Sequence, residues 1–410
     1  MRQLDDALGV GSTVSETDAG ALPRGLCVSD NGGQMKAILR GTAALYLCCA
    51  STVAFAGKLP GGTGVNFLVG FNEAWFGQPG FGPNYVNYLA SDPAWIPPIP
   101  NSTFDPNFVK TMFDGIMANA NGGTRIVRIW VFTALQGIVL DRTKSPQTQR
   151  LTQLSDGPGA DLIGNLQTVF TLAKQYQGRL KVYVTALNGG DMQVAATNIS
   201  GLRPYFQNLL TNTAEIDAFK TRALLPLLNL LNANRDIIYA FDLINEIEAP
   251  LNSGYSSWTS WTAARGWIKN MTDYVKLNTT IAPETTSWLP VTSSAGWGSA
   301  VQEITLGLFS GLNLDFYDLH VYSDFGKYPG QPALCNKVSA DNVPIILGEY
   351  GQKSHTYSDS IQSTATAGFI NGAKTHCFSA ALAWKYETSE TWWEYLIPGI
   401  GFRNAYYLIH

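Results

Sequence analysis

The chain of 410 residues is 45% hydrophobic and only 14% charged, which is enough apolar material for a large core and excludes an intrinsically disordered protein. Its formal net charge is -4 and no run of Lys or Arg appears, so we expect no nucleic-acid partner. Eleven Trp, 18 Tyr and 19 Phe suit a packed core and a sugar-binding cleft equally well, because sugar rings stack on aromatic faces.

The first 56 residues differ in composition from the rest of the chain. Residues 1–34 are rich in Gly, Ser and Asp without apolar periodicity, and we interpret them as a disordered or non-native upstream extension. Residues 35–56 have a basic start, an apolar centre and a small-x-small end at Ala56, which are the three parts of a signal peptide. A membrane anchor or a buried first helix is the alternative, but the apolar part is short for a bilayer span. We expect cleavage near Ala56 and secretion to an extracellular or periplasmic compartment.

The predicted mature chain, residues 57–410, retains two of the five cysteines, Cys335 and Cys377. An even number of cysteines in an oxidising compartment permits one disulfide. Two unpaired buried thiols are the alternative, because the sequence does not show whether the two α-carbons lie within bonding distance.

From residue 57 onward, short β-branched or aromatic runs alternate with segments of helical periodicity. This pattern is typical of α/β proteins built from βα units around a parallel sheet. Eight strands are predicted at residues 66–72, 125–132, 180–187, 237–245, 288–292, 316–322, 343–349 and 379–386. The fifth is interrupted by Pro290, which cannot donate a hydrogen bond to a neighbouring strand. The alternation predicts a single catalytic domain with the fold of a (β/α)8 TIM barrel.

The carboxyl ends of the strands hold the active site in such barrels, so their polar residues are the functional candidates. The fourth predicted strand ends in Asn245-Glu246, and the seventh ends in Gly348-Glu349. Retaining cleavage of a glycosidic bond needs a carboxylic acid that protonates the leaving oxygen and a carboxylate about 5 to 5.5 Å away that attacks the anomeric carbon. Two glutamates at strand ends can meet across a barrel mouth, so this pair predicts glycosidic chemistry.

The motifs at these strand ends resemble glycoside hydrolase family 5, the cellulase and β-mannanase family of the retaining barrel clan. The resemblance rests on Asn-Glu after the fourth strand, His-Val-Tyr after the sixth and Gly-Glu-Tyr-Gly after the seventh. It extends to the family's Arg on the second strand and Trp on the eighth. The matching residues here are Arg128, Asn245, Glu246, His320, Tyr322, Glu349 and Trp384.

The resemblance implies a role for each matching residue. Glu246 is similar to the family's acid/base, Glu349 to its nucleophile, and Asn245 to the residue that hydrogen-bonds the sugar 2-hydroxyl. Arg128 and Tyr322 are similar to groups that hold the nucleophile. We expect this guanidinium and this phenol to lower the pKa of the nucleophile, which has to stay ionised beside a second carboxyl.

Two further matches and one departure complete the predicted site. The resemblance implies that His320 joins the acid/base network and that Trp384 stacks on the sugar before the scissile bond. The family has a His near the end of the third strand, where this chain has Asn188. This departure leaves two interpretations: either Asn188 takes over the hydrogen bonding of that His, or the chain belongs to a neighbouring family of the clan. Glu73 is followed two residues later by Trp75. We expect these residues either to line an outer sugar subsite or to form an ordinary polar loop.

Other carboxylates compete for the catalytic roles. Asp242 and Asp318 lie inside predicted strands, where a buried structural role is favoured. Arg128 has a structural alternative as well, an ion pair with Asp242 or Glu248. The four histidines show no metal-ligand spacing, and the chain has neither a Gly-x-Ser-x-Gly elbow nor a phosphate-binding Gly loop. We therefore expect no metal and no cofactor.

The sequence thus predicts a retaining endo-β-1,4-glycanase that acts on β-mannan or β-glucan through a covalent glycosyl-enzyme. Its expected partner is a polysaccharide or oligosaccharide, with no membrane association of the mature form and a monomeric state. The alternatives are a catalytically silent carbohydrate-binding barrel, a transglycosylase and an exo-glycosidase of the same clan.

Overall fold

The computed structural model describes the greater part of the predicted catalytic domain. The described residues are 59, 67–74, 104–141, 143–144, 150–156, 161–190, 192, 202–252, 260–296, 300–322, 332–351, 359–384, 386, 396–397, 401–402, 405–406 and 409. The predicted extension at 1–34 and the predicted signal peptide at 35–56 lie outside them, so both stay predictions. Among the described residues, no helix is long and apolar enough to cross a membrane.

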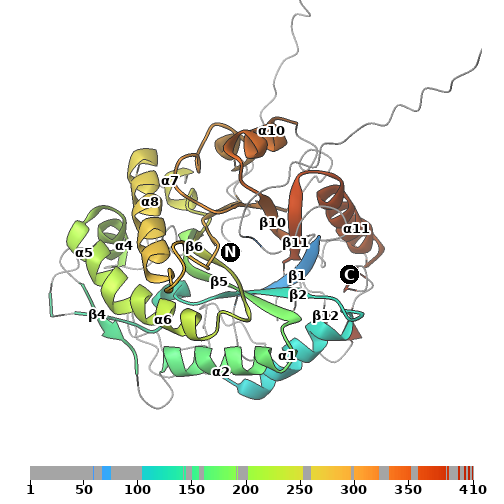
Figure 1. The fold of residues 1–410 in the computed structure, drawn as a ribbon, viewed down its shortest axis with the longest axis horizontal. Helices are drawn as coiled ribbons and strands as arrows, with labels where there is room; N and C mark the ends of the chain where they lie inside the picture. The colour runs from blue at the N-terminus through green and yellow to red at the C-terminus, as the bar shows by residue number, and fades with distance from the viewer. Residues whose placement is uncertain are drawn as a thin grey trace, which may run out of the picture. The chain divides into compact units, whose positions relative to one another are not determined.

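One sheet of parallel strand pairs forms the centre of the described domain (Figure 1). Its order is β7-β6-β5-β2-β1-β11-β10-β9-β8. The strands are β1 (Leu68–Glu73), β2 (Arg125–Trp130), β5 (Leu180–Asn188), β6 (Ile238–Asn245), β7 (Val291–Thr292), β8 (Ser294–Ala295), β9 (Tyr317–Val321), β10 (Ile345–Tyr350) and β11 (Phe378–Ala383). β7 and β8 are separated by Ser293 alone, and they pair with β6 and β9 respectively. This shared stretch closes the sheet, so the domain is a (β/α)8 barrel, as predicted.

The fifth barrel strand is the one whose predicted position is wrong. It starts at Val291 and continues to Ala295, whereas the sequence pattern placed it at 288–292. Pro290 stands just before the first strand residue, where its missing N–H disrupts no ladder. Its carbonyl oxygen accepts a hydrogen bond from the Phe241 N–H at 2.9 Å, which connects the entry of this strand to β6. The shift brings Ser294 into the barrel wall.

Helices connect successive strands and surround the sheet (Figure 1). They are α1 (Pro106–Ala118), α2 (Leu162–Lys174), α4 (Leu202–Thr211), α5 (Thr213–Phe219), a π-helical turn (Lys220–Leu224), α6 (Leu225–Ala233), α7 (Ala249–Asn252), α8 (Trp261–Asn278), α9 (Ala300–Thr305), α10 (Pro332–Asp341) and α11 (Asp359–Thr375). The start of α1 illustrates the local rules: the Asp105 carboxylate accepts the Asn107 N–H at 2.9 Å, and Pro106 occupies the first turn. Such caps fix where a helix leaves the preceding strand end.

Two short antiparallel pairs and a 3-10 turn lie outside the barrel sheet. β3 (Ile138–Leu140) pairs with β4 (Leu151–Leu154), and β12 (Leu396–Ile397) pairs with β13 (Gly401–Phe402). The 3-10 turn covers Thr133–Leu135 and begins three residues after the last residue of β2.

Two hydrophobic clusters divide the core. The larger lies between the strands and the helices that cover them, and it includes the apolar face of α1. The smaller draws side chains from several barrel strands and fills the barrel interior: Ile126, Tyr183, Tyr239, Ala240, Phe316, Ile346, Ala380 and Leu382. A closed barrel is a packed core rather than a pore, so functional side chains gather in the layer above this cluster.

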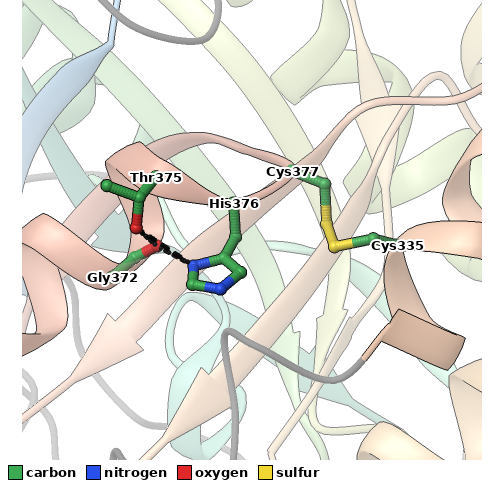
Figure 2. Close-up of a disulfide and its surroundings, with 5 residues drawn as sticks. All are labelled: Cys335, Gly372, Thr375, His376 and Cys377. Atoms are coloured by element: carbon green, nitrogen blue, oxygen red, sulfur yellow. Dashed lines mark hydrogen bonds between the residues drawn. A yellow bond between two sulfur atoms is a disulfide. The ribbon is translucent and has the colours of Figure 1, made fainter. Parts of the chain in front are cut away.

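A disulfide joins Cys335 of α10 to Cys377, the residue before β11 (Figure 2). The two α-carbons are 5.6 Å apart, which is an ordinary distance for a disulfide. The bond resolves the alternatives that the sequence left open for this pair. Beside it, the His376 ring nitrogen Nδ1 lies 2.6 Å from the Gly372 carbonyl at the end of α11.

Candidate active site

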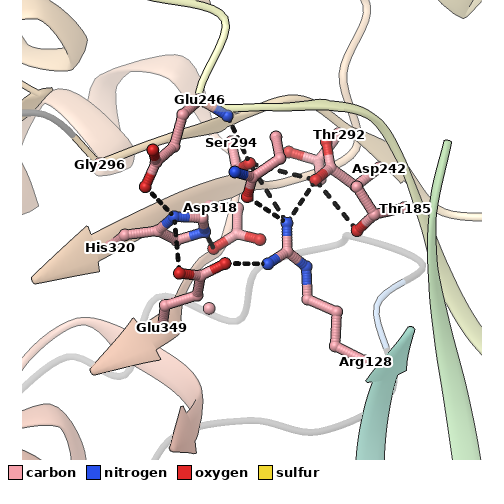
Figure 3. A network of polar contacts seen from close by, with 12 residues as sticks. Arg128, Thr185, Asp242, Glu246, Thr292, Ser294, Gly296, Asp318, His320 and Glu349 are labelled. Carbon is pink, nitrogen blue, oxygen red and sulfur yellow. Dashed lines mark hydrogen bonds and ion pairs between the residues drawn. The ribbon is translucent and has the colours of Figure 1, made fainter. Parts of the chain in front are cut away.

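Arg128 is the centre of a polar network at the carboxyl ends of the barrel strands (Figure 3). Its side chain is fully buried, and the two arms of its guanidinium serve different partners. Nη1 donates to Glu349 Oε1 and, at 3.1 Å, to Asn72 Oδ1. Nη2 donates to Asp242 Oδ2 at 2.7 Å and to Asn245 Oδ1 at 2.9 Å. Burial alone would lower the pKa of Arg128, but Glu349 and Asp242 raise it above its ordinary value, so the group stays charged.

Glu349, the predicted nucleophile, is buried at the end of β10. Its Oε1 accepts from Arg128, and its Oε2 accepts from the Tyr322 hydroxyl. Burial raises the pKa of Glu349; His320, Arg128 and the Tyr322 hydrogen bond lower it, and Glu246 raises it, with a net increase. The donors act in the expected direction, but loss of solvation outweighs them.

Glu246, the predicted acid/base, follows β6 directly and has a left-handed backbone with φ of 52°. This conformation is uncommon outside glycine and tends to occur at functional sites. The Glu246 N–H donates to Ser294 Oγ at 3.2 Å, which helps to hold the turn. A Cβ on Gly296 would overlap Glu246 Oε1, and one on Gly189 would overlap the Glu246 carbonyl oxygen. Two glycines thus leave room for this residue.

His320 lies between the two glutamates. Its Nδ1 is 3.0 Å from Glu246 Oε1 and 3.5 Å from Glu349 Oε2. One oxygen of each glutamate and one ring nitrogen of His320 all lie within 4.8 Å of one another. Among the described residues, these three side chains are the group whose donor atoms are close enough together to hold a metal ion. Both oxygens of Glu349 already accept hydrogen bonds from Arg128 and Tyr322, an arrangement that suits a fixed carboxylate.

Asn188 is at the end of β5, where the resemblance expected a His. Its Oδ1 accepts from Asn245 Nδ2 at 3.1 Å and from the Gly190 N–H at 3.1 Å. Asn245 is therefore fixed on both sides, because its own Oδ1 accepts from Arg128. The structure brings Asn188 into the predicted site through Asn245.

Three aromatic side chains stand beside the network. Trp384, just after β11, is partly exposed, and its ring centroid lies 5.4 Å from that of Trp130. The Tyr322 ring meets Trp384 edge to face with centroids 6.4 Å apart. Trp384 is thus next to Tyr322, the residue that donates a hydrogen bond to Glu349. The predicted subsite residue Trp75 lies outside the described residues.

Sequence reasoning missed several members of the network. Asn72, at the end of β1, donates to the Gly348 carbonyl at 2.9 Å and to the Ala383 carbonyl at 3.3 Å. Its position in an apolar strand could have marked it, since the same rule found Asn245. Ser294 was missed because its strand was misplaced; its hydroxyl donates to Asp242 Oδ2 at 3.1 Å.

The remaining carboxylates are buried, as expected for Asp242 and Asp318. Asp242 forms an ion pair with Arg128, as the sequence analysis considered for a structural role of this arginine. Arg128 also forms an ion pair with Glu349. Glu248 is buried and accepts the Gly296 N–H.

Comparisons with known proteins agree with this architecture. No family model matches the sequence, and no curated protein matches it. Among solved structures, the endo-1,4-β-mannanase of Rhizomucor miehei shares 17% identity over 80% of this chain and 89% of that chain, with a TM-score of 0.53. The β-1,4-mannanase of the sea hare Aplysia kurodai shares 17% over 78% and 87%, with a TM-score of 0.53. The β-1,4-D-mannanase of Cryptopygus antarcticus shares 19% over 78% and 84%, with a TM-score of 0.51. At these identities the likeness shows the fold, a (β/α)8 barrel shared with these mannanases.

Proposed function

We propose that the protein is a retaining glycoside hydrolase similar to family 5, with Glu246 as acid/base and Glu349 as nucleophile. The observation that carries the proposal is the placement of these two carboxylates at the ends of β6 and β10, with an oxygen of one within 4.8 Å of an oxygen of the other. Retaining enzymes hold their carboxyl groups about 5 to 5.5 Å apart, whereas inverting enzymes need about 6.5 to 9.5 Å to admit a water. The short separation favours direct attack by a carboxylate.

The two glutamates differ in surroundings as the two roles require. The Glu349 side chain is 3% exposed and both its oxygens are held by donors, which orients it for attack on an anomeric carbon. The Glu246 side chain is 18% exposed, so it can exchange protons with solvent and with a leaving group. Different environments for two carboxyls are the usual basis for dividing acid and nucleophile roles.

The proposed reaction proceeds by double displacement. A Glu349 oxygen bonds to the anomeric carbon while the bond to the glycosidic oxygen breaks, and that oxygen takes the proton of Glu246. In the second step, a water gives a proton to Glu246 and its oxygen bonds to the anomeric carbon as the ester to Glu349 breaks. Asn245, fixed by Arg128 and Asn188, would hydrogen-bond the sugar 2-hydroxyl during both steps.

We propose a β-1,4-linked mannan or glucan as the substrate and endo action as the mode. Support comes from the mannanases among the structural neighbours and from the partly exposed Trp384 beside the network, which offers a stacking surface.

The test is to incubate residues 57–410 with galactomannan, glucomannan, soluble cellulose, mixed-linkage glucan and xylan, and to analyse the products by chromatography. Proton NMR of the first products should give the β anomer before mutarotation. Glu349→Ala serves as the inactive control. Absence of cleavage of every glycan, cleavage at an unchanged rate by Glu349→Ala, or initial α products would contradict the proposal. Release of single sugars from chain ends alone would replace endo by exo action.

The two glutamate roles are separated by azide rescue with an activated aryl β-glycoside of the sugar that is cleaved. Azide can replace the missing nucleophile in Glu349→Ala, and the product is then an α-glycosyl azide. In Glu246→Ala, azide attacks the covalent intermediate instead and gives the β-glycosyl azide. Exchanged product configurations would reverse the assignment.

We also propose that the enzyme is exported, with cleavage near Ala56. The Cys335–Cys377 disulfide supports this proposal, because such bonds persist in oxidising compartments. N-terminal sequencing of the protein recovered from the medium or periplasm tests it, and a mature end far upstream of residue 57 would contradict it.

A further inference from the structure

Asp318 is a buried carboxylate that the double-displacement mechanism does not use. It lies on β9 two residues before His320, so both side chains point to the same face of the strand, into the barrel. Its Oδ2 accepts the Tyr183 hydroxyl at 2.6 Å. Its Oδ1 faces His320 Nε2 at 3.7 Å (Figure 3). Both side chains are fully buried.

The two atoms that face each other have no other partner among the described residues. Asp318 Oδ1 and His320 Nε2 are both buried without a hydrogen bond in that part of the chain. Burial lowers the pKa of His320, so its ring is neutral near pH 7 and carries one N–H. A proton on Nε2 faces the Asp318 carboxylate across 3.7 Å, which is longer than a hydrogen bond, and is attracted by the carboxylate charge. A proton on Nδ1 would instead set two lone pairs against each other.

The barrel wall is shaped around this carboxylate. A Cβ on Gly348 of β10 would overlap Asp318 Oδ1, so the glycine leaves the space that the carboxylate fills. Burial raises the pKa of Asp318 to about 6, and the group is therefore ionised at neutral pH, where it can accept a hydrogen bond. The titratable and charged groups around the Asp318–His320 pair are Arg128, Tyr183, Tyr239, Asp242, Glu246, Tyr322 and Glu349.

We propose that Asp318 is a positioning residue that holds His320 in the Nε2–H tautomer, so that His320 Nδ1 accepts a hydrogen bond from protonated Glu246. The hydrogen bond of one ring nitrogen decides which tautomer the other presents. An accepting Nδ1 at 3.0 Å favours the neutral acid form of Glu246, which the first step requires. This inference rests on the proposed function, since it explains how the acid keeps its proton beside a second carboxyl.

Asp318→Asn tests the proposal because the structure dictates how the new amide turns. The Tyr183 hydroxyl donates to the Oδ2 position, so the amide oxygen takes that place and the NH2 group faces His320 Nε2. His320 then has to carry its proton on Nδ1, and it donates to ionised Glu246. The alkaline limb of kcat/KM should move to lower pH by about one unit, which is a tenfold loss at neutral pH with activity at acid pH retained.

Asp341→Asn is the matched control. Asp341 Oδ2 also accepts a tyrosine hydroxyl at 2.6 Å, from Tyr317, but it lies at the end of α10, outside the network. This variant should keep the pH profile of the wild type. An unchanged alkaline limb in Asp318→Asn, or an equal shift in Asp341→Asn, would overturn the proposal.

A direct reading of the tautomer does not depend on turnover. Nitrogen-15 NMR of histidine-labelled protein at pH 7 should show His320 as Nε2–H in the wild type and as Nδ1–H in Asp318→Asn, with the signal assigned by its loss in His320→Gln. Nδ1–H in the wild type, or the same tautomer in both proteins, would refute the inference while leaving glycan hydrolysis intact. Failure of the wild type to cleave any glycan would refute the proposed function instead.

Discussion

Replacing Arg128 by Met removes the one cation that faces both Glu349 and Asp242 in the described network. Met fills most of the space of the arginine stem, so the change removes the charge and the hydrogen-bond donors of the guanidinium while largely keeping the side-chain volume. Both carboxylates are almost fully buried, with side-chain exposures of 3% for Glu349 and 0% for Asp242. Neither can recover its lost hydrogen bonds from water.

The expected cost follows from leaving buried charges without their partner. Breaking a buried ion pair on one side costs about 3 to 5 kcal/mol, because the remaining charge stays desolvated. Unfolding entropy of about 2.1 cal/mol/K per residue gives a barrel of about 350 residues roughly 0.7 kcal/mol/K, so the cost corresponds to a fall in Tm of about 4 to 7 °C. Activity should fall as well, by at least about a hundredfold, since Glu349, the proposed nucleophile, loses one of its two holding donors.

The assay compares Tm by calorimetry and kcat/KM on the glycan that is cleaved. Arg125→Met is the matched control, on the same strand but with the guanidinium bound to the Asn119 carbonyl at 2.6 Å rather than to a carboxylate. It should retain wild-type kcat/KM and lose less stability than Arg128→Met. Arg128→Lys should lie between wild type and Arg128→Met, because one ammonium cannot reach both carboxylates as the guanidinium does. Equal losses in Arg125→Met and Arg128→Met would refute the reasoning.

Three further measurements probe other parts of the structure. Gly296→Ala should lower kcat at least about tenfold and also lower Tm, because the new Cβ overlaps the Glu246 carboxylate and the Cβ of the buried His320; wild-type kcat would show that Glu246 has room to move. Replacing Cys335 and Cys377 by Ser should cost about 4 kcal/mol of unfolding free energy for a separation of 42 residues, with kcat unchanged; an equal stability of both proteins under oxidising conditions would contradict the bond. The pKa of Asp318 is raised from 3.8 to about 6 on folding, so its contribution to stability is complete below about pH 4 and is lost as pH rises through 6. Unfolding free energies should show wild type losing roughly 2 kcal/mol relative to Asp318→Asn between pH 4 and pH 7, and parallel pH curves would disprove this.

The strand ends could be predicted from the sequence because a barrel strand is a local pattern. An apolar run that ends in polar residues indicates both the strand and its carboxyl end at the barrel opening, and this rule located Asn245-Glu246 and Glu349. Arg128 was identified through the family resemblance, as the Arg on the second strand, rather than by this rule. The closure of the barrel followed from the number of such runs.

The partners within the network could not be predicted in the same way, because they depend on register between distant strands. Asn72 contacts Gly348 and Ala383, which are 276 and 311 residues away along the chain. The fifth strand shows a second limit. Its apolar run is only a few residues long and Pro290 comes just before it, so the bounds of the strand could not be predicted correctly from the sequence. Its true position brings Ser294 to Arg128 and Asp242, a contact that no spacing in the sequence indicates.

The raised pKa of Glu349 shows why solvent exposure has to be known before charge partners are counted. Arg128 and Tyr322 both favour the ionised carboxylate, and the sequence suggested both contacts. Burial nevertheless dominates, because removing water from a carboxylate costs more than these donors restore. This balance suits the role proposed for Glu349: the carboxylate is held in one orientation, and it is less stabilised as an anion than a solvated carboxylate, so less solvation has to be lost on attack. Glu246, with its more exposed side chain beside a neutral His320, has the surroundings that the proposed proton-exchanging role requires.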